Sequence, residues 1–502
     1  MRTRSGSRTT WWAAGLAGAA LLVASCADDT SSAGSDASPG PTAEPAVTDV
    51  TDAAATADSS PVTGSAATAS TVTEATGSAS TGSATCRPGE PADLVVWHSF
   101  GGDVAVDEFD RLVAEYGRVH GVTVRAEKVG GYIELIARLA ESDLSDWPDI
   151  VVGPTTATRT LLDSQRFVVP GACGETTRFT DAMLPVIDAT YRVDGELVAV
   201  PYGVSAPVLI FDRAEFRAAG LDPDDPPATL DELVEASAAI VASGASPYGL
   251  VLDDHVLHWI VQHYAARRGE LLIEPDNGRT GEVALDLVSD EVLADVATVR
   301  AGIEAGHVRW LGPNVSSFDD LVALVAPEQA GTMTIHTSGS IGDVIANIET
   351  GSFPGVELGV APLPGPGVGS AVGGNALWLV DSGDPSRVGA AWDLASWLFD
   401  APQLARFVVA TGYVPATTDA AADPVAAARW AQYPQLRVAF DQLAAMPGTD
   451  ASGGLVIGPA DELADELYRA ASSVFADGVD PTEALHEVER SIDELARRYP
   501  NV

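Results

Sequence analysis

The segment from Val200 to Arg213 constrains the fold of this chain more than any other stretch. A short apolar strand ends at Pro201, a polar kink follows, and a second apolar strand begins at Pro207. Pro207 forces the residue before it into an extended conformation, so the kink cannot be helical. The apolar run from Pro207 to Phe211 is too short for a helix and fits a buried strand. We interpret this segment as the passage of the chain from one lobe to another.

Strands and helices alternate at the start of the folded part. Short apolar runs predict strands at 94–97, 122–124 and 149–153, and apolar residues at helical spacing predict a helix through Phe109 and another over 132–141. This βαβ order predicts a mostly parallel sheet covered by helices, with ligands at the carboxyl ends of the strands. The residues expected at that edge are Trp97, His98, Thr155 and the loop before Tyr132.

Further elements are expected beyond the crossing segment. Thr229 to Glu232 form a capping box, which begins a helix that should end before Gly244. Asp384 and Pro385 cap another helix. The remaining elements are a helical region at 255–267, strands at 333–337, 357–361 and 376–380, and an amphipathic tail helix at 480–499.

The charge balance is strongly acidic. The 502 residues include 71 Asp and Glu against 28 Lys and Arg, which gives a net charge of −43. Nucleic acid is excluded as a partner because its phosphates require clustered cations. The folded part is not expected to lie on an anionic membrane surface for the same reason. The length suggests more than one domain.

The N-terminus has the features of an export signal. A basic region precedes an apolar run over 11–24, which is too short to span a bilayer comfortably and ends in small residues. The sequence that ends at Cys26 resembles a bacterial lipobox, in which the cysteine is lipidated and becomes the mature N-terminus. We predict a lipoprotein signal peptide over 1–25 and a lipid anchor at Cys26 that holds the protein on the outer face of the membrane. An ordinary signal peptide with a cysteine there by chance is the alternative.

The segment 26–85 is predicted to be a disordered tether. From residue 27 it is rich in Ser, Thr, Ala, Gly, Pro and Asp and contains no aromatic residue, Lys or Arg. Such a segment cannot bury enough apolar surface to offset the entropy lost on ordering.

Two cysteines remain, Cys86 where the folded part begins and Cys173 in a glycine-containing loop. In an exported protein an isolated pair favours a disulfide over two free thiols. Two cysteines are too few for a zinc site, and His98 is poorly placed to help them. We therefore predict a disulfide between Cys86 and Cys173.

Several short motifs occur together in the folded part. They are Val96-Trp97-His98-Ser99-Phe100-Gly101-Gly102, Gly131-Tyr132, the crossing from Pro201 to Phe211, Ala219-Gly220-Leu221-Asp222-Pro223, Thr337-Ser338-Gly339-Ser340, Gly373-Gly374-Asn375-Ala376-Leu377-Trp378 and Thr411-Gly412-Tyr413-Val414-Pro415. Through these motifs, residues 90–499 resemble the extracellular solute-binding proteins of ABC importers, in particular the glycerol-3-phosphate-binding branch. Each motif alone is weak, and their common order makes the resemblance specific.

The resemblance implies an α/β fold of the periplasmic-binding-protein type, with two lobes, a hinge and a ligand cleft between the lobes. Lobe 1 would comprise 86–204 with 376–415, and lobe 2 would comprise 205–375 with 416–502. Closure of the lobes around a solute belongs to the known motions of such proteins.

Ligand-binding positions also follow from the resemblance. Those that match are Tyr132, Ser205, Thr337 with Ser338 beside it, Gly374, Tyr413 and Trp259, in whose place an ungapped alignment puts His258. Trp97 adds a further aromatic face. Two positions depart from the family, because its glutamate after the third strand is Thr155 here and its phosphate-facing arginine is Val456. Aromatic faces and hydroxyls suit a sugar or polyol ring, so a neutral solute is favoured over glycerol 3-phosphate.

The expected function is capture of a small solute and its delivery to the transmembrane subunits of an ABC permease, by a monomer that touches the membrane only through its lipid. No enzyme activity, metal or cofactor is expected. A ligand-sensing surface lipoprotein on the same scaffold and a secreted glycoside hydrolase remain as alternatives. The chain has neither a Gly-x-Ser-x-Gly elbow nor a zinc signature.

Overall fold

The computed structural model describes residues 85–498 except 254, 282, 313–320 and 322–330. These residues belong to one compact unit, 82–502. The predicted signal peptide, Cys26 and the predicted tether up to residue 84 lie outside the described residues.

The first sheet has the strand order β2-β1-β3-β13-β4, and β7 pairs with β13 beyond this path. Its strands are β1 (Leu94–His98), β2 (Val124–Lys128), β3 (Ile150–Pro154), β4 (Phe167–Val168), β7 (Val200–Ser205) and β13 (Gly373–Val380). β1 runs parallel to β2 and β3, whereas β13 runs antiparallel to β3, β4 and β7. The expectation of a mostly parallel sheet is therefore wrong beyond the first three strands. The chain reaches β13 from β12 through the non-helical segment 363–372, so no helical crossover fixes the direction of β13.

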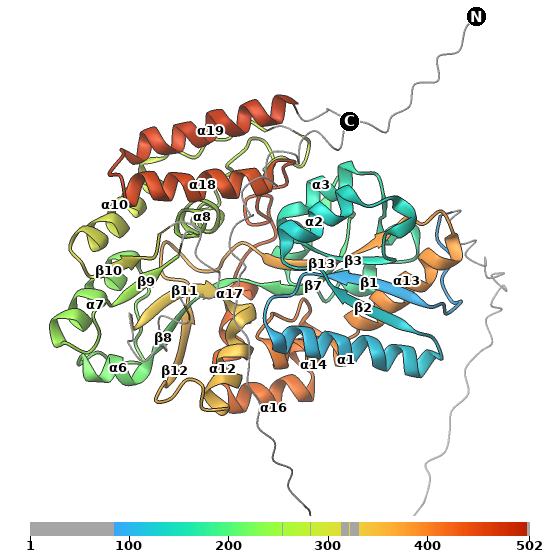
Figure 1. Ribbon diagram of the computed structural model, residues 1–502, viewed down its shortest axis with the longest axis horizontal. Coiled ribbons are helices and arrows are strands. Elements are labelled where there is room, and N and C mark those ends of the chain that lie inside the picture. Colours follow the sequence, from blue (N-terminus) through green and yellow to red (C-terminus); the bar gives the residue numbers. More distant parts are fainter. Residues whose placement is uncertain (1–84, 254, 282, 313–320, 322–330, 499–502) are drawn as a thin grey trace, which may run out of the picture. The chain divides into compact units, whose positions relative to one another are not determined.

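Helices cover both faces of this sheet. In Figure 1, α2 (Tyr132–Glu141) and α3 (Thr158–Asp163) lie above the strands, and α1 (Asp103–His120) and α14 (Ala401–Thr411) lie below. α13 (Pro385–Phe399) follows β13 and packs against α1. Smaller elements of this part are α4 (Thr177–Thr180), α5 (Pro185–Thr190) and the hairpin of β5 (Arg192–Val193) with β6 (Glu196–Leu197).

The second sheet has the strand order β10-β9-β11-β8-β12. Its strands are β8 (Pro207–Asp212), β9 (Leu250–Leu252), β10 (Val308–Trp310), β11 (Met333–Thr337) and β12 (Leu358–Pro362). The helices that follow or cover it are α6 (Arg213–Ala218), α7 (Leu230–Ser243), α8 (Val256–His258), α9 (Ala265–Arg268), α10 (Asp290–Glu304), α12 (Ile341–Glu349), α18 (Ala460–Phe475) and α19 (Pro481–Arg498). α15 (Thr418–Ala421) and α16 (Pro424–Gln432) pack against α14, and α17 (Val438–Ala444) contacts β8 and β12 as well as α5.

Two apolar cores hold the sheets together, and β8 contributes to both. Val208 and Ile210 belong to the core that contains the first sheet, whereas Leu209 and Phe211 belong to the other. This alternation follows from the two-residue period of a strand. A run that is apolar at every position is thus required here, as the sequence indicates.

The chain passes between the sheets at Ala206, which separates β7 from β8. β7 does not end at Pro201 as predicted but continues to Ser205, because Gly203 adopts a φ of 70° that lets the strand bend without stopping. The chain returns between Pro362 at the end of β12 and Gly373 at the start of β13. The predicted crossing is confirmed, while the proposed lobe boundaries remain a prediction.

Local signals predicted several helix boundaries. α7 begins with the predicted capping box of Thr229 and Glu232 and ends at Gly244, which has a left-handed φ of 75°. α2 spans the predicted 132–141. The strand expected at 122–124 instead begins at Val124, because the Val122 N–H caps the end of α1 by donating to the Gly117 carbonyl at 3.0 Å. The helical region after His255 contains an unexpected π-helical turn, Trp259–Tyr264.

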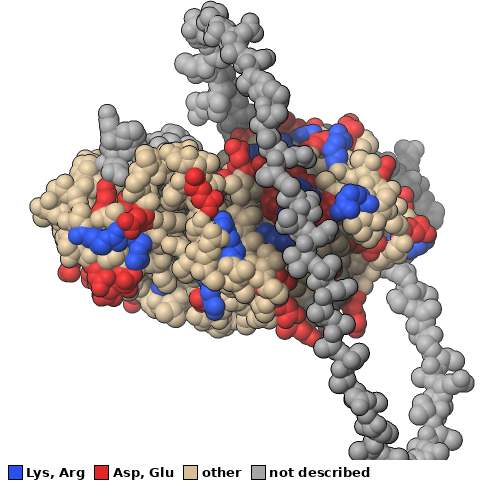
Figure 2. All heavy atoms as spheres, turned by 90° about the horizontal axis from the view of Figure 1, so that it is seen from below, with Lys and Arg blue, Asp and Glu red and all other residues tan. Residues whose placement is uncertain are grey.

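The predicted disulfide between Cys86 and Cys173 is confirmed, with 5.0 Å between the two Cα atoms. Among the described residues, no helix combines the length and apolar character needed to cross a membrane. Figure 2 shows one face of the molecule, on which acidic and basic residues lie beside one another among neutral ones. Pairs such as Arg300 with Glu304, 2.8 Å apart, offset part of the acidic charge locally.

Candidate ligand-binding site

The carboxyl edge of the first sheet gathers several predicted site residues. β1 ends at His98, whose carbonyl accepts a hydrogen bond from the Val129 N–H just before α2. β3 ends at Pro154, which pairs with Asn375 of β13. Parallel strands followed by helices place the loops after β1, β2 and β3 together, as the sequence predicted.

Tyr132 lies at the first position of α2 and reaches across this edge. Its hydroxyl accepts a hydrogen bond of 3.2 Å from the Asn375 amide, Nδ2. Desolvation by the surrounding protein raises the pKa of this hydroxyl, although 39% of the residue remains exposed. Tyr132 thus combines an accessible ring with a fixed polar end. The Asn375 amide oxygen, Oδ1, is buried without a hydrogen-bond partner in the described part of the chain.

Thr155 links the ends of two strands to Tyr191. Its hydroxyl lies 2.7 Å from the Tyr191 hydroxyl and donates to the Gly374 carbonyl at 3.0 Å. Burial raises the pKa of Tyr191 above its usual range, so this hydroxyl stays protonated at any physiological pH. Thr155, Gly374 and Tyr132 are therefore brought together as expected, with Tyr191 and Asn375 as additional members.

Gly374 is required at its position by the backbone. It has a φ of 94°, and a Cβ there would lie 2.1 Å from the Gly203 carbonyl oxygen on the neighbouring strand. Ser205 at the end of β7 pairs with Gly373 and is 6% exposed. The crossing strand and β13 hence approach so closely here that only glycine fits.

The turn after β11 packs against the same crossing. Ser338 is fully buried, donates its N–H to the Ala206 carbonyl at 2.9 Å, and accepts from the Ala206 N–H with Oγ at 3.3 Å. The Thr337 hydroxyl accepts from the Gly339 N–H at 3.4 Å. Both predicted hydroxyls therefore stabilise the turn and the crossing, and Thr337 is the more accessible of the two.

Tyr413 is buried between the first sheet and this turn. Its ring stacks on Phe407 with 5.5 Å between centroids, and a Cβ at Gly339 would lie 2.8 Å from its Cε1. Desolvation raises the pKa of Tyr413, and the nearby Tyr132 and Asp343 raise it further. At 8% exposure Tyr413 offers little ring face to a solute.

Trp97 and His98 are more enclosed than their place at a strand end suggests. Trp97 is 3% exposed, and the Arg138 guanidinium carbon lies 3.8 Å from the centre of its ring. His98 is 1% exposed and packs against Phe100 and Phe109. Burial lowers the pKa of His98 to about 4, so it is neutral at pH 7. The ring face of Trp97 is thus occupied by Arg138.

Trp259 and His258 lie where α8 meets the π-helical turn. Trp259 stacks on His255 with 5.6 Å between centroids, and its indole N–H is buried without a partner among the described residues. His258 lies 3.3 Å from the Gln262 amide through Nδ1, and burial lowers its pKa to about 3. Both are partly exposed, and both remain predicted contacts of a solute.

Val456 stands where the resemblance places the family's phosphate-facing arginine, so this position carries no positive charge. Val456 is 3% exposed, and its N–H donates to the Asn277 carbonyl at 2.9 Å. Arg279 reaches this loop from another segment, but its guanidinium donates to the carbonyls of Gly454 at 3.0 Å and Ala189 at 3.1 Å. Its hydrogen-bonding capacity is therefore directed largely to backbone carbonyls.

Tyr191, Asn375 and Asp461 were not singled out as site residues from the sequence. Asn375 gave a weak signal, since it is a polar residue at the start of an apolar strand. Tyr191 gave none. Asp461 lies in the first turn of α18 and hydrogen-bonds Thr156, and desolvation raises the pKa of its carboxyl.

Comparison with known proteins decides the family. Residues 111–438 match the family model described as bacterial extracellular solute-binding protein. The chain belongs to this family.

Two curated relatives of this solute-binding protein carry the same name. It is 28% identical to the sn-glycerol-3-phosphate-binding periplasmic protein of Brucella melitensis over 241 residues, 47% of this chain and 52% of that protein. The chain thus spans about half the length of this relative. It is 24% identical to the protein of the same name from Rhizobium meliloti over 424 residues, 82% of this chain and 95% of the relative.

Solved structures share the fold of this solute-binding protein. A Mycobacterium tuberculosis protein crystallised with glycerophosphocholine has a TM-score of 0.66 and 19% identity, and the alignment covers 82% of this chain and 99% of that one. A cyclic α-maltosyl-1,6-maltose binding protein from Arthrobacter globiformis has a TM-score of 0.62 and 20% identity, over 82% of this chain and 100% of that one.

Proposed function

We propose that this chain is the substrate-binding receptor of an ABC importer, exported and anchored to the outer face of the membrane by a lipid on Cys26. Membership of the extracellular solute-binding family supports the receptor role, and relatives bear the names of periplasmic binding proteins. The lipid anchor rests on the lipobox-like sequence alone.

The proposed solute is a neutral sugar or polyol. The observation that carries this choice is the set of uncharged groups at the carboxyl edge of the first sheet, namely the hydroxyls of Tyr132, Thr155 and Tyr191 and the amide of Asn375. The buried Asn375 Oδ1 has an unused acceptor that a solute hydroxyl would satisfy. The exposed part of Tyr132 offers a ring face for stacking.

A phosphate monoester is less well matched to these residues. It is held best by a charged fork such as a guanidinium, which gives short, charge-assisted hydrogen bonds. Val456 stands at the family's phosphate-facing position and has no polar side-chain atom. Arg279 lies at the same loop but donates to the carbonyls of Ala189 and Gly454. Thr155 replaces the glutamate that would grip a glycerol hydroxyl, and it already donates to Gly374.

The proposed cycle involves no chemical step. A solute that bridges the first sheet and the turn after β11 would favour the closed arrangement, because it has partners on both sides only when the two sides approach. Movement would concentrate at the crossing between Ser205 and Pro207 and in the non-helical return segment 363–372, because these segments join the two sheets. The permease would then receive the solute from the closed form.

Calorimetry with the full-length chain tests the solute class. Maltose, ribitol, glycerol 3-phosphate and glycerophosphocholine are titrated in turn, followed by the Tyr132→Phe variant. We expect a neutral saccharide or polyol to bind and Tyr132→Phe to weaken it about three- to tenfold, the effect of one neutral hydrogen bond.

Tyr433→Phe is the matched control, because it also removes one hydroxyl but from a tyrosine that bonds Glu349 away from this edge. It should leave the affinity unchanged. Tight binding of glycerol 3-phosphate with no response to any neutral saccharide would overturn the proposed solute class.

The anchor has its own test. Cys26→Ser should release the protein into the medium or leave it unprocessed, since the thioether to the lipid cannot form. If the variant fractionates with membranes as the wild type does, lipidation at Cys26 is wrong, whatever the solute proves to be.

A further inference from the structure

A pocket lies at the opposite end of the first sheet from the candidate solute site. Its volume is about 490 Å³, within the range of small-molecule sites. It is bounded by the last turn of α1, the second half of α13, the segment Cys86–Pro91, here called the N-terminal strap, and the loop at Gly174. α1 ends next to the start of β1, where the Leu94 N–H donates to the Thr123 carbonyl at 2.9 Å. The pocket and the solute site therefore share no residue.

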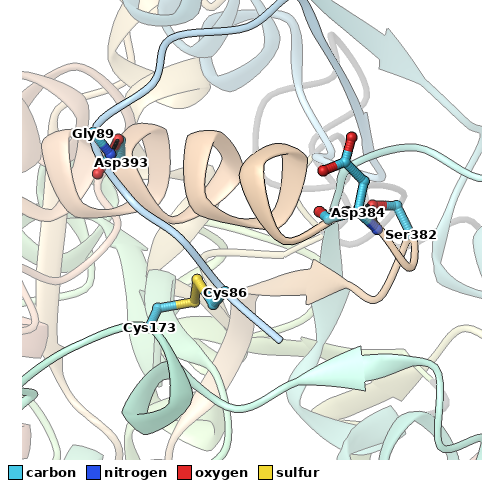
Figure 3. The surroundings of a disulfide bond; sticks show 6 residues. All are labelled: Cys86, Gly89, Cys173, Ser382, Asp384 and Asp393. Atoms are coloured by element: carbon cyan, nitrogen blue, oxygen red, sulfur yellow. Dashed lines mark hydrogen bonds between the residues drawn. A yellow bond between two sulfur atoms is a disulfide. The ribbon is translucent and has the colours of Figure 1, made fainter. Parts of the chain in front are cut away.

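The N-terminal strap is held in place at three points. The disulfide joins Cys86 to Cys173, the Arg87 N–H donates to the Pro385 carbonyl at 2.7 Å, and the Gly89 N–H donates to the Asp393 carboxylate at 2.7 Å. Figure 3 shows the strap running beside α13, with the disulfide near one end and Gly89 at Asp393. A Cβ at Gly389 of α13 would lie 2.0 Å from the Arg87 carbonyl oxygen, so the strap lies directly on the helix. This wall of the pocket is thus fixed.

Aromatic rings form much of the remaining wall. Tyr116 is stacked on His120 with 4.2 Å between centroids and meets Trp397 edge-on at 5.5 Å. Trp392 lies against Phe179 at 5.3 Å on its other side. Aromatic faces attract cations through their quadrupole, most strongly where water is partly excluded.

Acidic groups supply the complementary charge. The carboxylates of Glu175, Asp393 and Asp400 line the pocket. Its lining residues, all within the described part of the chain, include no Lys or Arg, and His120 is the one basic side chain among them. The Ser396 hydroxyl also lines it, is 7% exposed, and has no hydrogen-bond partner among the described residues. An unpaired buried hydroxyl costs free energy unless a bound group or water satisfies it. The Ser396 hydroxyl therefore favours a ligand that carries a hydrogen-bonding group at one end.

We propose that this pocket binds a small organic cation, with its ammonium group between Asp393 and the rings of Trp392 and Trp397, and a hydroxyl or carbonyl of the ligand at Ser396. Methylated ammonium groups fit best, because they offer positive charge and apolar surface together. This proposal does not depend on which solute binds at the carboxyl edge of the first sheet.

Choline and its neutral isostere 3,3-dimethylbutan-1-ol are the probes for the full-length chain. Indole N–H signals, assigned with Trp392→Phe and Trp397→Phe, are followed by NMR during titration. We expect choline to shift the Trp392 and Trp397 signals saturably and the isostere to bind at least about tenfold more weakly, as expected when a cation loses its charge at aromatic and carboxylate groups. The choline affinity should fall as salt concentration rises.

Two variants separate charge from shape. Asp393→Asn keeps an acceptor for the Gly89 N–H and should weaken choline about tenfold, while Glu175→Gln in the exposed loop should weaken it less without disturbing the helices. Asp441→Asn is the matched control, since it removes the same charge from an exposed pair with Arg437 elsewhere, and it should leave the affinity unchanged.

Three results would overturn the proposal. They are equal binding of choline and its isostere, the absence of a choline response at both indoles, and a choline affinity that depends on Tyr132→Phe but not on Asp393→Asn or Glu175→Gln. The last result would assign choline to the solute cleft instead. If Asp393→Asn fails to fold, Glu175→Gln and the isostere comparison still decide.

Discussion

Gly374 allows the close approach of β7 and β13 to be tested with a single methyl group. An L-residue in a left-handed conformation costs about 1–2 kcal/mol, and Gly374 has a φ of 94°. The added Cβ would also lie 2.1 Å from the Gly203 carbonyl oxygen. Because that atom belongs to the backbone of the neighbouring strand, the overlap is relieved only by shifting a strand, at about 1–3 kcal/mol. Gly374→Ala should therefore lower the free energy of unfolding by about 2–5 kcal/mol.

Gly373→Ala provides the matched control one residue earlier. Gly373 does not have a positive φ, and its Cβ would lie 3.5 Å from the Ser205 Oγ, an ordinary contact. Its effect should be small, because a compatible Gly→Ala change restricts the unfolded chain by about 0.4–1 kcal/mol. Urea unfolding followed by circular dichroism compares the two variants. Equal midpoints would refute the reasoning, whereas loss of folded protein with Gly374→Ala alone would support it.

Three further predictions concern stability. Replacing Cys86 and Cys173 by Ala should lower the free energy of unfolding by about 4 kcal/mol, because the disulfide closes a separation of 87 residues. A urea midpoint of the wild type that is the same with and without reductant would contradict this prediction. Burial lowers the pKa of His98 to about 4, so between pH 6.5 and 4 the unfolded chain binds a proton at His98 that the folded chain does not bind. As the pH is lowered through this range, the free energy of unfolding should therefore fall by at most about 3 kcal/mol from this residue. The urea midpoint of His98→Phe should depend less on pH than that of the wild type. Asp149 is 4% exposed and accepts hydrogen bonds from the Val95 N–H at 2.8 Å and from the half-exposed Arg387. Asp149→Asn should lower the free energy of unfolding in urea by about 1–2 kcal/mol, whereas Asp441→Asn at an exposed ion pair should lower it by less than about 0.5 kcal/mol. Equal effects of the two substitutions would contradict this prediction.

Local signals in the sequence were sufficient for several of the elements. The capping box at Thr229 and the glycine at 244 bound α7, and the alternation of apolar residues required β8 to be buried on both faces. These features depend on residues within a few positions of one another, so the sequence carries them directly. The pairing of Cys86 with Cys173 was also accessible, because only two cysteines remain after the one at the lipobox.

The assembly of the candidate site was accessible only in part. The edge to which Tyr132 and Thr155 belong follows from the βαβ order, and the need for a glycine-rich segment at 373–374 follows from the resemblance. Contacts of Tyr132, Trp259 and the other predicted site residues with a solute remain predictions.

What only the tertiary structure decided is which side chains meet across long separations. Arg138 covers the ring of Trp97, Tyr191 completes the hydroxyl pair with Thr155, and Asn375 meets Tyr132 from 243 residues away. The elements with clear local signals were predictable because backbone hydrogen bonding and solvent exposure repeat with a short period along the chain. Contacts such as Asn375 with Tyr132 have no such period, since they depend on the direction in which β13 enters the sheet, and that direction is set by packing of the whole molecule.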